Sequence, residues 1–182
     1  MKVKDVVLKA AALLGEAETV EAFIKGTNTA GKKQAELFLT CFNLVENELA
    51  LDYIPLLKEE YLTAANGKIV YSDFSLDVVR IVRVRDKNGA SMPFSLFADY
   101  MQVDGDGAYV TYAYTPKEKT FTGESDFAVG VSVRLMAYGV AAEYCMAMGL
   151  YEESAHWDKK YKEGIEGARS VERKKMPSRR WV

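Results

Sequence analysis

The stretch from residue 66 to residue 89, NGKIVYSDFSLDVVRIVRVRDKNG, decides the fold class, because apolar spacing changes there from helical to extended. β-Branched residues alternate with polar ones over residues 68–71 and 78–86. Such alternation is typical of strands that turn one side toward a core and the other toward solvent. The pair Asn88-Gly89 then predicts a tight turn before residues 92–94. This part of the chain therefore predicts antiparallel strands.

A second predicted hairpin follows. Residues 100–103 and 108–115 flank Asp104-Gly105-Asp106-Gly107, and Asp-Gly is a preferred turn pair. A small antiparallel sheet therefore occupies residues 68–115. The Asp-Gly repeat also opens like a calcium loop, but Ala108 stands where an EF-hand needs a further oxygen ligand. We therefore interpret the repeat as a turn.

Helical spacing governs the residues before this sheet. Apolar residues three, four and seven positions apart predict a first helix that Gly15 closes and a short second helix before Gly26. A longer third helix should continue until Pro55, which limits its extension. We expect residues 56–62 to add one or two more helical turns.

Helical spacing returns after a polar loop at residues 116–125. We expect Ser125 or Asp126 to cap a long helix that ends at about Gly149, followed by a last helix that begins near Glu152. The long helix is unusually rich in alanine and glycine. Glycine costs about 1 kcal/mol in a helix interior relative to alanine, which is tolerable where a neighbouring backbone comes close.

The expected fold class is mainly α with a β insertion (α+β), a helical bundle that carries a small antiparallel sheet. The bundle comprises residues 1–65 and 126–170, and the insertion comprises residues 68–115. Together, residues 1–170 form one domain. Residues 171–182 should form an extended basic tail.

The composition indicates a soluble globular protein. The chain has 182 residues, of which 49% are hydrophobic and 27% charged, enough for one core. No apolar run approaches the roughly 18 residues of a membrane-spanning helix, and the N-terminus lacks a signal-peptide core. Cys41 and Cys145 lie in apolar helical patterns and should be buried free thiols. We therefore expect no membrane partner and assembly in a reducing cytoplasm.

Catalytic chemistry has little support in the sequence. His156 is the sole histidine, and no catalytic serine motif, phosphate-binding glycine loop or zinc-type cysteine spacing accompanies it. We therefore predict no catalytic, cofactor-binding or metal-binding residue, no cofactor, and no enzymatic activity. A small hydrolase with a carboxylate pair distant in sequence is the less favoured alternative.

A single-stranded nucleic-acid-binding module is the other alternative. Aromatic rings on one predicted strand and guanidinium groups on a partner strand could stack on bases and bind phosphates. The residues concerned are Tyr109, Tyr112 and Tyr114 with Arg80, Arg83 and Arg85. The formal net charge of -2 disfavours this function, because no overall field gathers phosphates.

The basic end of the chain is the most informative local feature. Residues 171–182 contain five basic residues and one glutamate, and they finish in Arg179-Arg180-Trp181-Val182. Arginine and tryptophan are the residues most enriched at binding hot spots. A solvated terminus is the ordinary alternative for such a composition.

Several stretches resemble a known family. They are NELALDYIPL at residues 47–56, YAYTP at 112–116, LMAYGVAAEYC at 135–145, WDKKY at 157–161 and PSRRW at 177–181. In this order they resemble the head-tail connector proteins, also called adaptor or head-completion proteins, of siphovirus-type tailed bacteriophages. The resemblance covers most of the chain from about Glu46 onward. The inserted sheet is larger than in the simplest four-helix members.

The resemblance implies a structural virion protein of the phage neck. Such proteins form a ring, commonly of twelve subunits, under the portal and present a platform to a tail or stopper protein. DNA passes through the lumen without sequence recognition, and the C-terminal segment reaches into the portal. Carried onto this sequence, portal docking falls to Lys174, Lys175, Pro177, Arg179, Arg180 and Trp181. A ring made by repeating one contact needs no cofactor or catalytic residue.

Overall fold

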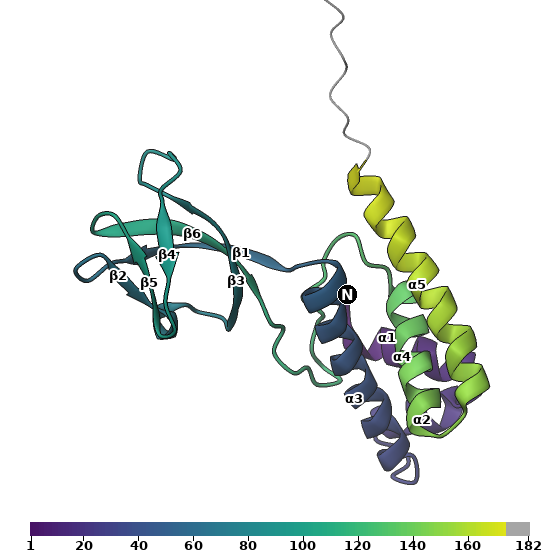
Figure 1. The fold of residues 1–182 in the computed structure, drawn as a ribbon. Helices are drawn as coiled ribbons and strands as arrows, with labels where there is room; N and C mark the ends of the chain where they lie inside the picture. The colour runs from purple at the N-terminus through teal and green to yellow at the C-terminus, as the bar shows by residue number, and fades with distance from the viewer. Residues whose placement is uncertain (174–182) are drawn as a thin grey trace, which may run out of the picture. The chain divides into compact units, whose positions relative to one another are not determined.

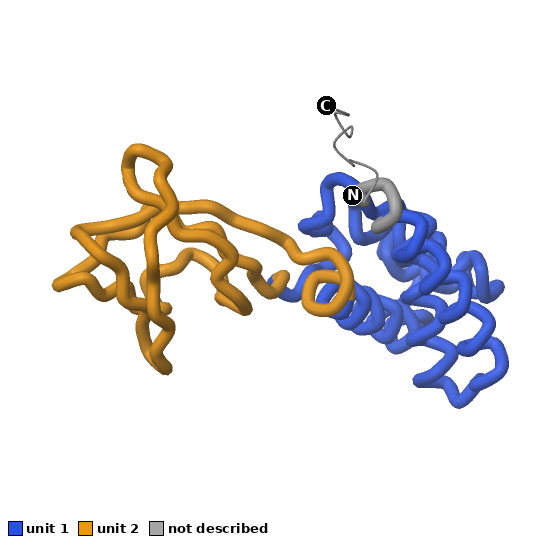
Figure 2. The backbone as a smooth tube through the Cα atoms, turned by 45° about the horizontal axis from the view of Figure 1, so that its top comes forward, with its two compact units in different colours: residues 1–48, 117–182 blue, residues 49–116 orange. Residues whose placement is uncertain are grey.

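The computed structural model describes the backbone of residues 1–173 and the side chains of residues 1–168. The chain divides into two compact units, coloured differently in Figure 2. The helical unit contains Met1–Glu48 and the residues from Lys117 onward, and the β unit contains Leu49–Pro116. Helices and antiparallel strands thus occupy separate parts of the chain, which confirms the α+β prediction.

The helical unit is built around one central helix (Figure 1). Its helices are α1 (Val3–Leu13), α2 (Ala17–Ile24), α3 (Lys32–Glu48), α4 (Val133–Ala147) and α5 (Tyr151–Arg173). Helix α4 packs against α1, α3 and α5. Because three helices cover it, α4 is buried over most of its length. Cys41 and Cys145 are buried free thiols in this unit, as predicted.

Gly139 permits the close approach of three helices. A Cβ atom at this position would lie 2.8 Å from Cγ1 of Val45 on α3 and 2.9 Å from Cε2 of Tyr161 on α5. Both distances are shorter than normal contacts between carbon atoms. The small residues of α4 therefore provide room for its neighbours.

The predicted start of α4 was wrong. Ser132 is the N-cap, and its Oγ accepts a hydrogen bond of 3.1 Å from the amide of Leu135. Ser125 and Asp126 do not cap this helix, because it begins only at Val133. They lie in the preceding loop, where their amides donate to the carbonyl of Met1 and to a carboxylate oxygen of Glu46. The residues before Ser132 form a loop packed on the helical unit.

The end of the chain also differs from the prediction at its boundary. Residues 171–173 continue α5 and are not part of an extended tail. Glutamate and arginine are good helix formers, and the next proline that could end the helix is Pro177.

No helix of the described part is long and apolar enough to cross a membrane.

The β unit consists of two three-stranded antiparallel sheets. The strands are β1 (Leu57–Thr63), β2 (Lys68–Val70), β3 (Val78–Arg85), β4 (Phe94–Leu96), β5 (Tyr100–Val103) and β6 (Gly107–Tyr114). One sheet has the order β1-β6-β3 and the other β2-β5-β4. Ile69, Met101, Val110 and Tyr112 are fully buried in a core that belongs to this unit.

The prediction of a helix over residues 56–62, and with it a helical core over residues 1–65, was wrong. Helix α3 continues as a π-helical turn, Leu49–Tyr53, and ends before Pro55. The next residues form β1, which pairs with β6 from Leu57↔Ala113 to Thr63↔Gly107. The strand partner lies some fifty residues away, so its stabilisation is invisible in the local pattern.

The prediction of one sheet built from two hairpins was also wrong. The Asn88-Gly89 turn exists, with Gly89 at φ 83° and a hydrogen bond from Asp86 N to Ala90 O of 2.9 Å. However, β3 takes β6 as its main partner, and β4 pairs with β5. Strands β5 and β6 follow each other in sequence yet belong to different sheets, because β6 lies between β1 and β3.

Candidate interaction surfaces

Three arginines gather on one face of the β1-β6-β3 sheet. In the register with β6, Arg80 lies opposite Ala113, Arg83 opposite Thr111, and Arg85 opposite Tyr109. Alternate residues of β6 point to the same side of a sheet, so all three arginines share the face of residues 109, 111 and 113. Strand β1 adds Glu59 and Tyr61 to this arginine face.

Two β-bulges produce this arrangement. The register shifts between Val78 and Arg80 and again between Ile81 and Arg83, so one extra residue enters β3 at each place. Consequently Val78, Ile81 and Val84 recur every third residue on the core side. The inserted Val79 and Val82 are exposed, at 48% and 45%. A strictly alternating strand would have divided the arginines between two faces.

The charges on the arginine face are only partly compensated. Arg85 forms an ion pair with Glu59, which also accepts a hydrogen bond of 2.8 Å from Thr111. Hydrogen bonds from Thr111 and Arg85 lower the pKa of Glu59. Arg80 and Arg83 are exposed, and the rings of Tyr61 and Tyr109 lie 5.1 Å apart. The face therefore combines cationic and aromatic groups.

The other two tyrosines of the predicted nucleic-acid surface lie on the opposite, core side. Tyr112 is fully buried, and its hydroxyl donates a hydrogen bond of 2.7 Å to Glu60. Ser75 donates two more hydrogen bonds to the same carboxylate, from its amide and from its hydroxyl. Tyr114 is partly buried against the same core. The structure thus brings Tyr109, but not Tyr112 or Tyr114, to the arginines.

Burial and hydrogen bonding act in opposite directions on Glu60. Burial alone would raise the pKa of Glu60, but hydrogen bonds from Tyr112 and Ser75 and the charge of Lys58 outweigh it and lower the pKa. Burial and the neighbouring carboxylate raise the pKa of Tyr112. This arrangement keeps the carboxylate ionised and the phenol protonated. These hydrogen bonds connect β1, β6 and the loop residue Ser75.

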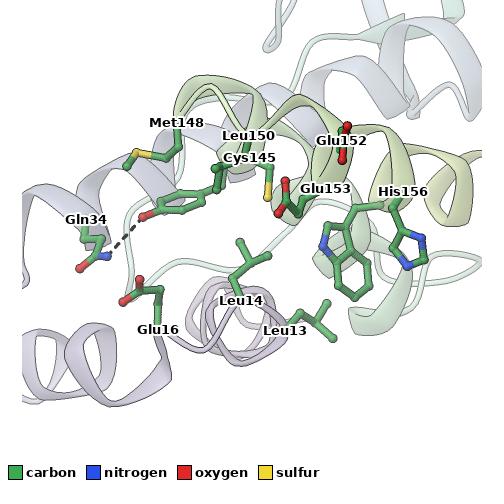
Figure 3. A pocket seen from close by; sticks show the side chains of 12 residues that line it. Leu13, Leu14, Glu16, Gln34, Cys145, Met148, Leu150, Glu152, Glu153 and His156 are labelled. Atoms are coloured by element: carbon green, nitrogen blue, oxygen red, sulfur yellow. Dashed lines mark hydrogen bonds between the residues drawn. The ribbon is translucent and has the colours of Figure 1, made fainter.

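A pocket of about 630 Å³ opens in the helical unit (Figure 3). Its apolar wall consists of Leu13 and Leu14 at the end of α1, with Met148 and Leu150 at the turn between α4 and α5. The polar lining includes Glu16, Gln34, Glu152, Glu153 and His156, together with the ring of Trp157. Gln34 donates a hydrogen bond of 3.3 Å to the hydroxyl of Tyr144.

The pocket lacks the geometry of a carboxylate pair. Figure 3 shows Glu16 and Glu153 on different sides, with apolar side chains between them. His156 is exposed on α5 and makes an edge contact with Trp157. Cys145 lines the same pocket, but burial raises the pKa of its thiol, so the nucleophilic thiolate is disfavoured. We see no nucleophile and base arranged as a unit.

The Asp-Gly repeat at residues 104–107, which was predicted to be a turn, connects β5 and β6. Asp104 and Asp106 lie in the exposed turn before β6. In the described residues 1–173, no group of three histidine, cysteine or acidic side chains could hold a metal ion.

The residues predicted to dock on a portal, Lys174, Lys175, Pro177, Arg179, Arg180 and Trp181, lie outside the described residues.

A buried carboxylate, missed by the sequence reading, fixes the loop before α4. Glu46 on α3 is 1% exposed and accepts a hydrogen bond of 2.9 Å from the amide of Asp126. Asn43, one turn earlier, bonds both the amide and the carbonyl of Lys119. Lys119 in turn forms an ion pair of 2.8 Å with Asp126. The signal available in the sequence was a charged residue, Glu46, at a position of α3 that faces the core.

No protein-family model matches this sequence, and no curated protein is significantly similar to it. The relationship to head-tail connector proteins stays a prediction from the quoted stretches.

Proposed function

We propose that this chain is a structural subunit of a tailed-phage neck, a head-tail connector that acts by assembling and docking through its surfaces. It would form a ring, a dodecamer in the virion, under the portal, and its basic C-terminal segment would bind the portal. The β unit would then offer a platform for the tail or stopper protein. DNA would pass through the lumen without sequence recognition.

The observation that supports this proposal best is the amount of large apolar side chain exposed on the β unit. Ten such residues are exposed there: Leu51, Leu57, Tyr61, Val70, Val79, Val82, Phe94, Leu96, Phe97 and Tyr109. Exposed apolar surface rimmed by charged groups is typical of protein–protein interfaces. Arg80 and Arg83 supply such charges beside Val79 and Val82.

The helical unit supports the proposal in a second way. Helix α5 carries the chain directly into the basic segment that begins at Lys174. A rigid helix packed on α4 is a suitable base for a segment that docks elsewhere, because the helical unit does not need to rearrange. The described residues offer surfaces of this kind but no arranged catalytic group.

The proposal is tested by deleting residues 176–182. The truncated chain should keep its helical circular dichroism but fail to load onto purified portal rings of the same phage, observed by co-sedimentation and negative-stain imaging. The matched control exchanges Arg80 and Arg83 for glutamine, which leaves the docking segment intact. Normal loading of the truncated chain would contradict the docking role, and steady turnover of a small substrate by pure protein would contradict the whole proposal.

A second candidate function is binding of single-stranded nucleic acid by the arginine face. The observation that favours it is the convergence of Arg80, Arg83 and Arg85 on the face that also exposes Tyr61 and Tyr109. Two rings in contact with each other give a smaller stacking platform than the three expected from the sequence.

A salt series distinguishes the two functions. Binding through phosphates weakens steeply as salt rises, because counterions are released from the nucleic acid. Under the second function, Arg80→Glu with Arg83→Glu would abolish a salt-sensitive gel shift of a single-stranded oligonucleotide. Under the first, the parent chain gives no such shift at physiological salt.

A further inference from the structure

The pocket of the helical unit presents an acidic rim around an apolar floor (Figure 3). Glu16, Glu152 and Glu153 line it. Among the described residues, none of these three carboxylates has an ion-pair partner: the six ion pairs of the described chain involve other acids. Uncompensated carboxylates on different sides of one pocket favour a cationic occupant.

Apolar surface extends outward from the same pocket. Met146 at the end of α4, Met148 and Leu150 in the turn and Tyr151 at the start of α5 are exposed, at 53%, 54%, 46% and 68%. Four large apolar side chains exposed within six residues are unusual for a free surface and typical of a contact site. The pocket thus combines negative charge with uncovered apolar surface.

One segment of this same chain has the complementary chemistry. Residues 174–182, KKMPSRRWV, contain four cations, no acid, and the apolar residues Met176, Pro177 and Trp181. Guanidinium groups bind carboxylates through paired hydrogen bonds, and an indole fills a pocket with a large rigid surface. The pocket volume of about 630 Å³ lies within the range of pockets that hold drug-sized ligands, so the pocket can accept side chains such as an indole and a guanidinium group.

The length of chain between the pocket and Trp181 decides whether the segment can reach the pocket of its own copy. The pocket contains Trp157, and α5 continues for sixteen residues to Arg173, a rise of about 24 Å. The eight residues from Arg173 to Trp181 span at most about 27 Å when fully extended. Almost no length is left for the reversal that a return to the same pocket needs. A second copy has no such restriction.

We infer that the acidic pocket binds the C-terminal segment of a second copy of this chain, with Arg179 and Arg180 on the glutamates and Trp181 on the apolar floor. The contact is heterologous, because the segment of one copy meets the pocket of the next. Such a contact repeats and closes into a ring or continues as an open chain. The inference concerns the protein without portal and does not depend on the proposed function.

Light scattering of the full chain over a range of concentrations gives the first test. The parent should self-associate with increasing concentration and dissociate as salt screens the charges. Arg179→Glu with Arg180→Glu, the segment variant, should weaken association at least about tenfold, as should Glu152→Arg with Glu153→Arg, the pocket variant. Glu163→Arg with Glu166→Arg, the same charge change later on α5, should associate like the parent.

Mixing the two defective variants gives a sharper test. The pocket variant keeps an intact segment and the segment variant keeps an intact pocket, and the reversed charges of the other pocket and segment are again complementary, so mixing the two variants should restore association. This result also shows that both variants are folded. A parent that stays monomeric at all concentrations, or variants that associate like the parent, would overturn the inference.

A peptide experiment separates a second copy from other occupants. A dye-labelled peptide of residues 174–182 should bind the segment variant, measured by fluorescence polarisation, and should not bind the pocket variant. Equal binding to both proteins, or to neither, would overturn the assignment of the pocket. A monomeric parent whose own segment blocks the peptide would show that the occupant is intramolecular and would equally overturn it.

Discussion

At the scale of single residues, the pKa values of two glutamates, Glu46 and Glu60, are shifted in opposite directions. Burial raises the pKa of Glu46, and the hydrogen bonds and the charge of Lys119 offset this only in part. Its Oε2 atom has no hydrogen-bond partner among the described residues. Glu60, in contrast, has donors enough to lower its pKa. The two residues should therefore respond to pH in opposite directions.

Replacement of Glu46 by glutamine should remove a cost of charge burial. A folded-state pKa raised above the unfolded value of about 4.3 means that folding stability falls as pH rises from there through the folded pKa. We expect Glu46→Gln to be at least as stable as the parent at pH 7. Its stability should not show this decrease with rising pH, measured by urea unfolding at several pH values. Glu46→Ala should instead lose about 1–3 kcal/mol, because the Asp126 amide loses its acceptor.

The carboxylate of Glu60 should show the reverse behaviour. Its lowered pKa means that the stabilisation is present above the unfolded pKa of about 4.3 and is lost as pH falls through the folded pKa. Glu60→Gln should therefore be less stable than the parent at pH 7, and the difference should shrink in acid. Tyr112→Phe should cost about 0.5–1.5 kcal/mol through the lost hydrogen bond. A difference that is constant from pH 3 to pH 7 would contradict this account.

At the scale of elements, the sequence predicted helices well and strand partners poorly. The helical spacing located α1, α2, α3 and α5, because the pattern of apolar residues that marks each helix is local in sequence. The start of α4 was missed, because contacts distant in sequence, such as the hydrogen bond from the Asp126 amide to Glu46, hold the residues before Ser132 as a loop. The partner of β1 and the bulges of β3 also depend on residues distant in sequence.

The same reason limited the prediction of the candidate surfaces. The three arginines were recognised and their partner strand was correct, yet only the bulges determine that they share a face. Tyr61 was not included, because it was assigned to a helix. The acidic pocket combines four helices and has no sequence motif. Its residues could not be grouped before the fold was known.

Packing of α4 gives a prediction at this scale. Gly139→Ala should destabilise the helical unit by about 1–3 kcal/mol, because overpacking against Val45 and Tyr161 outweighs the better helix propensity of alanine. Gly167→Ala on α5 is the matched control, since its added Cβ would meet no atom of the described residues within 4 Å, apart from the backbone of its own helix turn. That change should be neutral or stabilising by up to about 1 kcal/mol. Thermal unfolding of both variants measures the difference; equal effects would contradict the packing argument.

At the scale of the whole molecule, the β unit is an insertion whose two ends are neighbours. Leu57 pairs with Ala113, and the amide of Tyr114 donates a hydrogen bond of 3.1 Å to the carbonyl of Leu56. The unit also has its own buried core. Both observations are typical of a domain that folds by itself.

Removal of the insertion should therefore leave the helical unit folded. A variant in which a short glycine-serine linker replaces residues 57–113 should keep its helical circular dichroism and a cooperative thermal transition. The separate fragment of residues 55–116 should show a β-type spectrum and cooperative unfolding. A molten helical remainder, or an unstructured fragment, would show that the two units need each other.

Neighbouring ends have a consequence for how such a chain changes over generations. Mutations, loop extensions or even a complete exchange of the inserted module leave the distance between its two points of attachment unaltered. The module can thus diversify to suit new neighbours while the helices that carry it remain under separate selection.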